Sequence, residues 1–377
     1  MRPIIGIAKE RSAGEHRVAL VPESIKKLTK QGFAVRFERG CGLLSHISDG
    51  DYEASGASAA TPEELWATAD LVVKVRPARI DEAKLARRGQ VVVSLVYAGL
   101  HESLVRDFAG SGVSLVSLDA VPRTTLAQAM DVLSSQATLV GYRAALLAAE
   151  AVPKIFPMLM TAAGTIAPAK VLVIGAGVAG LQAIATARRL GAAVEAFDVR
   201  RAAKEQVESL GARFVDTGTE DAETAGGYAR ELSAEGKAKQ AAVLAAHVAK
   251  ADACITTALI PGRRAPQIVT RAMVEGMRAG SVIIDAAAEM GGNCELTRAG
   301  ERVDHGGVTV IGAVDLPSAL AVHASQMFSR NVTKLIEHLC DKDGSLRLDA
   351  DDEIVRAVVM AHGGQLKAGL FGKEENR

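Results

Sequence analysis

Residues 170–199 read KVLVIGAGVAGLQAIATARRLGAAVEAFDV and predict a strand, a glycine-rich turn, a helix and a second strand. The run VLVIG at 171–175 is apolar and rich in β-branched residues, which is typical of a buried parallel strand. A helix from about Val178 to Leu190 follows, Gly191 ends it, and VEAFD forms the second strand. This order is the repeating unit of α/β domains with parallel sheets.

The three glycines of the turn, Gly175, Gly177 and Gly180, have the spacing of a dinucleotide-binding fingerprint. The first permits the tight turn, the second lets the backbone approach a pyrophosphate, and the third lets the helix pack closely on the sheet. The helix begins at Val178 and would direct its unpaired N–H groups at that pyrophosphate. Asp198 lies roughly 20 residues further on, where an acid bonds the adenosine ribose. We therefore predict an NAD(H) site.

The residues around Asp198 bear on the choice of dinucleotide. Its carboxylate would repel a 2′-phosphate, which favours NAD over NADP. Arg200 and Arg201 weaken that preference, because arginines accept a phosphate. Val199 and Arg200 are included with the predicted cofactor-binding residues.

Composition limits the alternatives. A chain of 377 residues is long for one core, so two domains are expected. Aromatic residues make up only 3%, so the cores must be built from Ala, Val, Leu and Ile. Basic and acidic residues balance at 44 each, which gives no indication of a nucleic-acid partner. With no apolar stretch near the ~20 residues of a membrane span, we expect a soluble, cytoplasmic protein.

Cysteine usage gives no sign of a metal site or a disulfide framework. The four cysteines have neither CxxC spacing nor a neighbouring histidine cluster: Cys41, Cys254, Cys294 and Cys340. We expect buried thiols in a reducing compartment and no metal.

Strands and helices alternate along the whole chain. Apolar strands are expected at 3–10, 33–38, 71–77, 91–98 and 113–119 in the first half, and at 251–257, 281–287 and 308–313 in the second. We expect one long helix from near Ala127 to Glu150, a loop at 160–168 and a final helical region from Pro317 through Leu339. Thr217 to Gln240 is polar and long for a connection, and we interpret it as a lid with Tyr228.

The predicted fold class is α/β, with two Rossmann-like, doubly wound parallel-sheet domains joined by long helices. The first domain comprises residues 1–126 completed by the C-terminal segment 325–377. The NAD(H)-binding domain comprises residues 127–324 and includes the linker helix.

Loops at predicted strand ends would line the nicotinamide side, because ligands lie outside the carboxyl ends of such strands. ITTALIPGR at 255–263 offers Thr257, Ala258 and Leu259, and IIDAAAEMGGN at 283–293 ends on Asn293, whose amide would bond the ribose. The alternative is that the Pro and Gly residues there only make turns. A second polar stretch begins at Arg123, with residues 128, 131 and 135 at helical spacing. A solvated helix start is the alternative there.

Longer motifs carry a family resemblance. They are RTTLAQAMDVLSSQATLVGYRA (123–144), MTAAGTIAPAKVLVIGAGVAGLQAIATARRLGA (160–192), KEQVESLGARF (204–214), ETAGGYA (223–229), ITTALIPGRRAP (255–266) and IIDAAAEMGGNCELT (283–297). In this order they resemble the NAD(H)-binding component of proton-translocating nicotinamide nucleotide transhydrogenase. The resemblance implies a homodimer that passes hydride directly from NADH to NADP held by a partner subunit. It also implies coupling to proton movement through membrane-embedded subunits, with this chain held at the inner membrane by them.

The resemblance also implies roles for individual residues. A catalytic Arg-Gln-Asp loop falls on Arg123, Gln128 and Asp131, with Ser134 beside it. A mobile-loop tyrosine falls on Tyr228. Leu126 is a departure, since the family has a second arginine there.

Two other functions stay open. Alanine dehydrogenase has a similar architecture and uses a lysine, a histidine and an aspartate. This sequence keeps Lys74, but Tyr97 stands in the histidine's region and Glu289 near the aspartate's. Without the imidazole no acid or base is poised for imine chemistry. A non-catalytic NAD-binding regulator is the other alternative.

Overall fold

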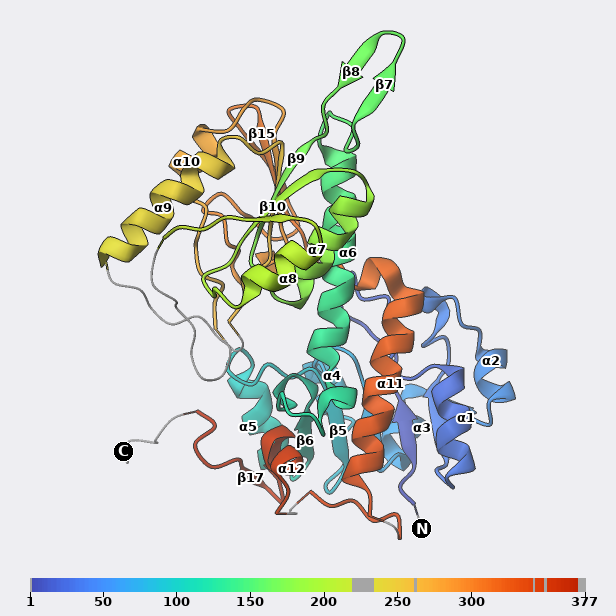
Figure 1. The fold of residues 1–377 in the computed structure, drawn as a ribbon. Coiled ribbons are helices and arrows are strands. Elements are labelled where there is room, and N and C mark those ends of the chain that lie inside the picture. The colour runs from blue at the N-terminus through green and yellow to red at the C-terminus, as the bar shows by residue number, and fades with distance from the viewer. Residues whose placement is uncertain (1, 219–233, 261–262, 342, 349–350, 372–377) are drawn as a thin grey trace. The chain divides into compact units, whose positions relative to one another are not determined.

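The computed structural model describes residues 2–218, 234–260, 263–341, 343–348 and 351–371 (Figure 1). The chain divides into two compact units, which we call unit 1 (Met1–Gln136 with Pro317–Arg377) and unit 2 (Ala137–Leu316). From the sequence we expect the divisions after residue 126 and before residue 325. Each unit is described by itself.

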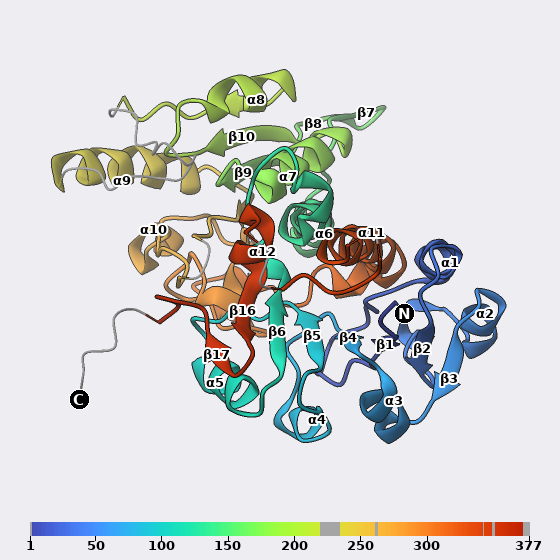
Figure 2. The same cartoon turned by 90° about the horizontal axis from the view of Figure 1, so that it is seen from below.

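Unit 1 contains an eight-stranded sheet (Figure 2), whose strands are β1 (Ile5–Ile7), β2 (Val35–Glu38), β3 (Ser58–Ala60), β4 (Leu71–Val73), β5 (Val91–Ser94), β6 (Ser114–Ser117), β16 (Val359–His362) and β17 (Gln365–Leu366). Strands β1 to β6 pair in parallel in the order β6-β5-β4-β1-β2-β3, which is the strand order of doubly wound dinucleotide-binding sheets. At the β6 edge, β16 and β17 add antiparallel pairs. The sheet is therefore mixed, not purely parallel.

Helices cover both faces of this sheet. They are α1 (Pro22–Lys30), α2 (Asp49–Ala54), α3 (Pro62–Thr68), α4 (Ile80–Ala83), α5 (Glu102–Gly110), α11 (Ala321–Leu339) and α12 (Glu353–Val358), with short 3-10 turns η1 (Leu43–Ser45), η2 (Leu118–Ala120), η3 (Gln128–Met130) and η5 (Ser318–Leu320). Figure 2 shows α3, α4 and α5 on one face and α1, α11 and α12 on the other. Alternate strand residues enter opposite cores, so Val91 and Val93 pack with Phe328 while Val92 packs with Trp66.

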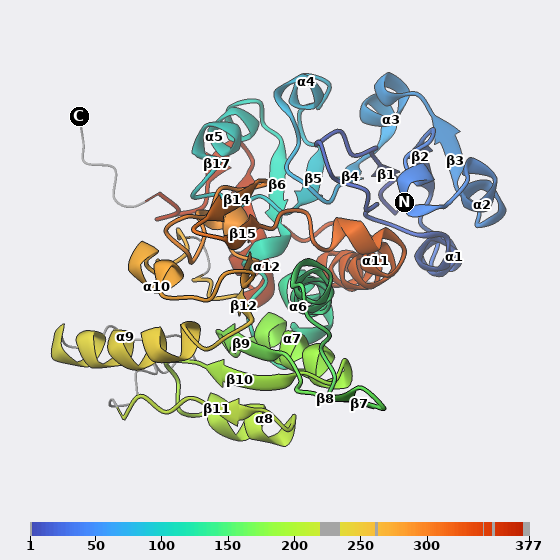
Figure 3. The same cartoon turned by 90° about the horizontal axis from the view of Figure 1, so that it is seen from above.

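Unit 2 contains a seven-stranded sheet (Figure 3), whose strands are β9 (Lys170–Ile174), β10 (Ala193–Phe197), β11 (Arg213–Phe214), β12 (Ala253–Thr256), β13 (Val282–Asp285), β14 (Arg302–His305) and β15 (Val308–Gly312). Their order is β11-β10-β9-β12-β13-β15-β14, and only β14 is antiparallel to its neighbour. The chain winds to one side of β9 and then to the other, so the topological switch point lies between β9 and β12.

The helices of unit 2 form two cores with this sheet. They are α6 (Val132–Ala151), which crosses the division between the units, α7 (Val178–Arg189), α8 (Ala203–Ser209), α9 (Ala234–Val248) and α10 (Arg271–Glu275), with the 3-10 turn η4 (Ala288–Met290). Helices α6 to α8 pack with Val171 and Val173 of β9, while α9 and α10 pack with Leu172 and Ile174. A strand buried on both faces explains the continuous apolar run in the sequence.

Three segments differ from the sequence prediction. The long helix begins at Val132, not near Ala127, because Asp131 is extended and caps it. The expected loop at 160–168 contains a hairpin of β7 (Leu159–Thr161) and β8 (Gly164–Ile166), which is exposed on both faces and so has no apolar alternation. Helix α9 begins at Ala234, within the stretch that we interpret as a lid. Tyr228 lies outside the described residues. Among the helices that the structure describes, none is both long and apolar enough to cross a membrane.

Candidate functional site

The glycine turn between β9 and α7 meets the geometric demands of the fingerprint. Gly175 has a φ of +95°, in the left-handed region that favours glycine. A Cβ on Gly180 would lie 1.8 Å from the carbonyl oxygen of Gly175, so only glycine lets α7 approach the turn. A Cβ on Gly177 would meet no described atom within 4 Å, and Val178 beyond it is exposed. The backbone at the start of α7 is therefore open at Gly177, as a pyrophosphate-binding turn requires.

Asp198 follows β10 and lies against this turn. Its Oδ2 accepts the backbone N–H of Ala176 at 2.7 Å. Its Oδ1 accepts the backbone N–H and the Nε of Arg200, both at 2.9 Å, and Oδ2 accepts the Nη2 of Arg200, also at 2.9 Å. The carboxylate that we predict at the ribose is therefore paired with the arginine that would otherwise attract a 2′-phosphate.

The loop after β12 joins the site on the other side of the switch point. Thr257 donates its hydroxyl to the carbonyl oxygen of Gly175 at 3.0 Å, and Leu259 is exposed. Asn293, fully buried, accepts the N–H of Ala258 at 3.0 Å and donates to the carbonyl oxygens of Ala258 and Pro266, both at 2.8 Å. The amide of Asn293 thus positions the loop through its backbone.

Asp285 supports the candidate site and was not predicted from the sequence. It ends β13, is fully buried, and its Oδ2 accepts the N–H groups of Asn293 and Cys294 and the hydroxyl of Thr297 at 2.6 to 3.0 Å. It therefore fixes the Gly-Gly turn that carries Asn293. The feature of the sequence that could have indicated Asp285 is a carboxylate at the end of an apolar strand. Gly291 and Gly292 have φ of +99° and +80°, so they do form a turn.

The predicted catalytic loop belongs to unit 1. Ala127 and Met130 anchor it in the core, and the amide of Asn331 donates to the carbonyl oxygen of Ala129 at 2.8 Å. Gln128 is exposed between these anchors, and Arg123 is exposed as well. The loop therefore presents the glutamine from a fixed backbone. Leu126, the departure from the family pattern, is also exposed.

Asp131 has a structural task at the end of this loop. Its Oδ1 accepts the backbone N–H of Ser134 at 2.9 Å and its Oδ2 accepts the hydroxyl of Ser134 at 2.5 Å. Asp131 is thus the N-cap of α6, which satisfies an N–H group that the helix leaves unpaired. The helix-start alternative holds for this residue, and a catalytic role would be additional.

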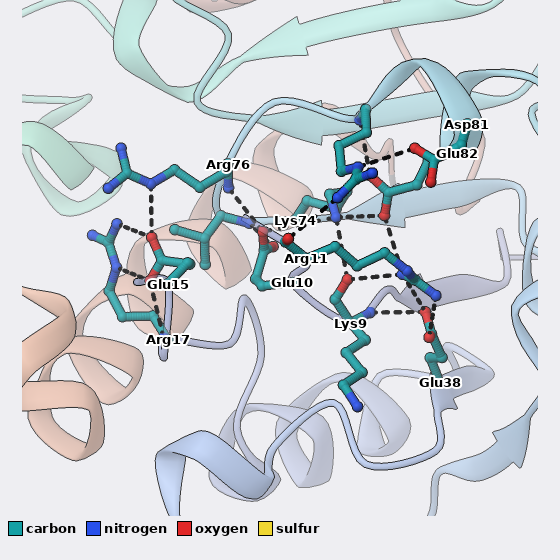
Figure 4. Close-up of polar contacts among 12 residues, drawn as sticks. Lys9, Glu10, Arg11, Glu15, Arg17, Glu38, Lys74, Arg76, Asp81 and Glu82 are labelled. Carbon is teal, nitrogen blue, oxygen red and sulfur yellow. Dashed lines mark hydrogen bonds and ion pairs between the residues drawn. The ribbon is translucent and has the colours of Figure 1, made fainter. Parts of the chain in front are cut away.

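A buried ionic cluster lies at the carboxyl ends of β1, β2 and β4 in unit 1 (Figure 4). Lys74 is 1% exposed, and its Nζ lies 2.8 Å from Glu82 Oε1 and 3.7 Å from Glu10 Oε2. Burial raises the pKa of Glu10 in spite of this lysine. Arg11 bridges two carboxylates, because its Nη1 lies 3.2 Å from Glu82 Oε1 and its Nη2 lies 2.6 Å from Glu38 Oε1. The lysine that an alanine dehydrogenase would use is therefore held by carboxylates of its own unit.

Glu15 is the centre of a second section of this cluster (Figure 4). Its carboxylate lies 2.6 Å from Arg17 Nη2 and 2.8 Å from Arg76 Nε, and it accepts the hydroxyl of Ser318 at 2.5 Å. Burial alone would raise the pKa of Glu15, but the bonds from Arg17, Ser318 and Arg76 outweigh it and lower the pKa to about 2.

Tyr97 and Glu289, the other two residues compared with alanine dehydrogenase, also make hydrogen bonds within the protein. Tyr97 has a φ of +48°, and its backbone N–H donates to Asp119 at 3.0 Å. Glu289 accepts the N–H of Asp315 at 2.8 Å. The described part of the chain contains no group of three or more metal-ligating side chains, and burial raises the pKa of all four thiols.

Models of both domains of one family match the chain. The description "Alanine dehydrogenase/PNT, N-terminal domain" matches residues 6–140, and "Alanine dehydrogenase/PNT, C-terminal domain" matches residues 144–368. The chain belongs to the alanine dehydrogenase/PNT family. Its membership confirms the family resemblance predicted from the motifs.

Members of this family differ in how closely they resemble the chain. It is 45% identical over 372 residues to the first part of the NAD(P) transhydrogenase alpha subunit of Rhodospirillum rubrum, covering 96% of this chain and 97% of that protein. A crystal structure of transhydrogenase from Sinorhizobium meliloti is also 45% identical, with a TM-score of 0.88 over 96% of this chain and 99% of that one. An L-alanine dehydrogenase structure has a TM-score of 0.81 over 96% of each chain at 24% identity, which shows the shared fold alone. The chain is therefore a transhydrogenase α-subunit homologue with the predicted α/β class, in mixed sheets.

Proposed function

We propose that the chain is the NAD(H)-binding part of a proton-translocating transhydrogenase, which passes hydride directly between its own NAD(H) and NADP(H) held by a partner subunit. The main support for the proposal is the glycine turn at the switch point of unit 2, where Asp198 accepts the backbone N–H of Ala176. It occurs in a chain that matches a transhydrogenase subunit along nearly its whole length.

When bound, NADH supplies the hydride, so the protein needs neither a metal nor an acid and a base for that reaction. The residues of this chain bind, orient and exclude water. The start of α7 at Gly177 and Val178 holds the pyrophosphate, and the fixed loop of Thr257 to Leu259 supports the nicotinamide side. Asp198, with Val199 and Arg200 beside it, holds the ribose.

The loop of unit 1 supplies the orienting polar groups in this proposal. Gln128 is exposed on a backbone that the core anchors. Family resemblance assigns it to bond a nicotinamide or ribose, and its anchored backbone would keep the loss of conformational entropy small. Arg123, Asp131 and Ser134 support it. Tyr228, outside the described residues, is assigned by family resemblance to the lid that closes over NAD(H).

The remaining activity belongs to partners that this chain does not contain. The name of the relative in Rhodospirillum rubrum describes it as the first part of an alpha subunit, which implies further parts. We propose that membrane-embedded subunits and an NADP(H)-binding subunit complete the enzyme. The chain would then be cytoplasmic and held peripherally at the inner membrane.

The decisive experiment is a stopped-flow assay of this chain mixed with an NADP(H)-loaded transhydrogenase partner subunit. We expect reduction of an NAD analogue by NADPH, with a label on the reacting nicotinamide carbon passing across without appearing in water. Gln128→Asn should slow this transfer roughly a hundredfold while NADH affinity stays within a few-fold, since it misplaces a positioned group.

Asp131 provides an internal control, because asparagine is also a good N-cap and alanine is not. Asp131→Asn should slow transfer at unchanged stability, whereas Asp131→Ala should in addition lose about 1 kcal/mol of stability. Wild-type rates of hydride transfer in both Gln128→Asn and Asp131→Asn would show that the loop only starts a helix and has no catalytic role.

Alanine oxidation is the second candidate function, and the same preparation tests it. Because Glu82 and Glu10 hold Lys74, we expect no NAD reduction with alanine in the absence of a partner. Brisk turnover of alanine would reverse this ranking. NADH binding without either activity would favour the remaining alternative, a non-catalytic NAD-binding regulator.

A further inference from the structure

Helix α6 contacts the first turn of α7 within unit 2 (Figure 1). The point of contact is Gly141, which is buried. A Cβ on Gly141 would lie 1.9 Å from the carbonyl oxygen of Ala179 and 2.9 Å from the backbone nitrogen of Ala183. A carbon and a carbonyl oxygen in contact are usually about 3.3 Å or more apart, so only glycine allows this approach.

The two groups that Gly141 meets belong to the part of α7 that faces the dinucleotide site. In an α-helix the carbonyl group of residue 179 pairs with the N–H of residue 183, so a Cβ at position 141 would press on both groups of one helical hydrogen bond. Gly177, the N-cap, provides no side-chain cap for the first turn. In the proposed function the free N–H groups of this turn meet the pyrophosphate.

A second close contact holds the same turn. A Cβ on Gly180 would lie 1.8 Å from the carbonyl oxygen of Gly175 and 3.1 Å from the hydroxyl oxygen of Thr257. Two missing side chains therefore set the position of the first turn of α7. Gly180 belongs to the fingerprint in the sequence, whereas Gly141 lies in another helix.

Helix α6 is the firmer side of the contact at Gly141. Its Ala144 and Ala148 are fully buried in the core of unit 2. In contrast, α7 begins beside open space, because a Cβ on Gly177 would meet no described atom within 4 Å and Val178 is exposed. A side chain at position 141 would therefore displace the first turn of α7, by roughly 1 Å, and leave α6 in place.

We propose that Gly141 is a fourth glycine of the dinucleotide site, a positioning residue that fixes the N–H groups of α7 against the pyrophosphate of NAD(H). This inference rests on the proposed function, because it concerns the same ligand. Hydrogen bonds weaken when their groups move apart, so a displaced turn loses affinity at the pyrophosphate. The predicted ribose contact, Asp198, follows β10 and does not belong to this turn.

Ligands with and without a pyrophosphate test this role. In titration calorimetry, Gly141→Ala should weaken the binding of NADH and of ADP by similar factors, roughly tenfold or more, since charge-assisted hydrogen bonds are lost. The affinity for adenosine, measured by NMR titration, should stay within about twofold because adenosine has no phosphate. Asp198→Ala should weaken adenosine binding as well, since it removes the ribose contact.

Gly6→Ala is the matched control for lost packing. Gly6 lies in β1 of unit 1, where a Cβ would lie 2.7 Å from the Cβ of Ala69 and 3.0 Å from the Cδ2 of Leu65. This variant should lower the midpoint of thermal unfolding and leave the affinity for NADH unchanged. A substitution at Gly141 that only loosened the fold would have the same two effects.

The wild-type chain provides a test that does not require any variant to fold. NADH and ADP should slow amide hydrogen exchange in α6 around Gly141, because they fix the turn that it contacts, whereas adenosine should not. Exchange in α10, which packs in the other core of unit 2, should change less.

Three results would overturn the inference and spare the proposed function, provided that the wild-type chain binds NADH. They are unchanged affinities for NADH and ADP in folded Gly141→Ala, an equal loss of affinity for adenosine and ADP, and exchange in α6 that NADH does not alter. A wild-type chain that binds no NADH would refute the proposed function and this inference together.

Discussion

Asp198 and Arg200 form the pair of residues that we propose sets the preference for NAD(H). The arginine lies two positions after the acid and bonds both of its carboxylate oxygens. The pair is mostly buried, with the acid 7% and the arginine 26% exposed, so water screens it little. A ribose hydroxyl can still add a hydrogen bond to the carboxylate, whereas a phosphate would meet its negative charge.

Removal of the carboxylate tests this preference. Wild-type chain should bind NADH much more tightly than NADPH in a fluorescence titration. Asp198→Ala should weaken NADH binding and strengthen NADPH binding, because it releases the Arg200 guanidinium toward a 2′-phosphate.

A double variant supplies the control. Asp198→Ala with Arg200→Ala should lose the gain in NADPH affinity. Equal affinities of the wild-type chain for the two dinucleotides would contradict the assigned role of Asp198.

At the scale of elements, two glycines of the turn between β9 and α7 lack a side chain for different reasons. Gly180 belongs to the packing of α7 against the turn, since its Cβ would collide with Gly175. Gly177 has open space in front of it, so the packing of the fold does not explain its lack of a side chain. We propose that this glycine serves the ligand, whereas Gly180 serves the fold.

Alanine substitutions should separate these roles. Gly180→Ala should destabilise the chain by roughly 3 kcal/mol or more, because backbone atoms must move. Gly177→Ala should leave the thermal unfolding midpoint nearly unchanged and weaken NADH binding at least tenfold. Calorimetry and NADH titration of both variants measure this. Equal loss of stability in the two would contradict the distinction.

At the scale of the molecule, contacts distant in sequence complete unit 1. Glu15 joins the loop after β1 to Arg76 and to Ser318, 303 residues away. The wild-type carboxylate has a lowered pKa, so its contribution to stability is complete above its ordinary value of 4.5 and is lost as pH falls toward about 2.

Glu15→Gln tests this link. The variant removes the buried carboxylate charge that pairs with Arg17 and Arg76, so it should lose about 3 to 5 kcal/mol at neutral pH. Its stability should also fall less steeply than that of the wild type between pH 4.5 and pH 2. Parallel denaturant titrations across this range are the measurement. Parallel pH profiles would contradict the assigned link.

The β7–β8 hairpin is the feature that favours the homodimer expected from the family resemblance. Met158, Leu159, Met160 and Ile166 are all exposed there, with Met160 at 74%. Exposed apolar groups concentrated in one element are typical of a protein interface. The alanines of α6 are, by contrast, largely buried in the core of unit 2.

Met160→Asp should shift the chain from dimer to monomer in sedimentation measurements, because it places a charge in the proposed interface. Ile80→Asp changes an equally exposed residue of unit 1, at 72%, and should leave the mass unchanged. A monomeric wild-type chain would contradict the homodimer expected from the family resemblance.

The sequence by itself determined the features that depend on neighbours along the chain. These are the apolar strands, the glycine turn with Asp198 at its proper distance, and the family. These features depend on local backbone geometry and on periodic burial, and both follow from the order of residues along the chain.

Only the tertiary structure decided which polar groups are already engaged. It pairs Asp198 with Arg200, turns Asp131 into a helix cap, and makes Asn293 and Asp285 supports of the nicotinamide-side loop. It also reveals the hairpin and brings Gly141 of α6 against the first turn of α7. Partners of a buried polar group come from distant strands and loops, and sequence spacing does not encode that proximity.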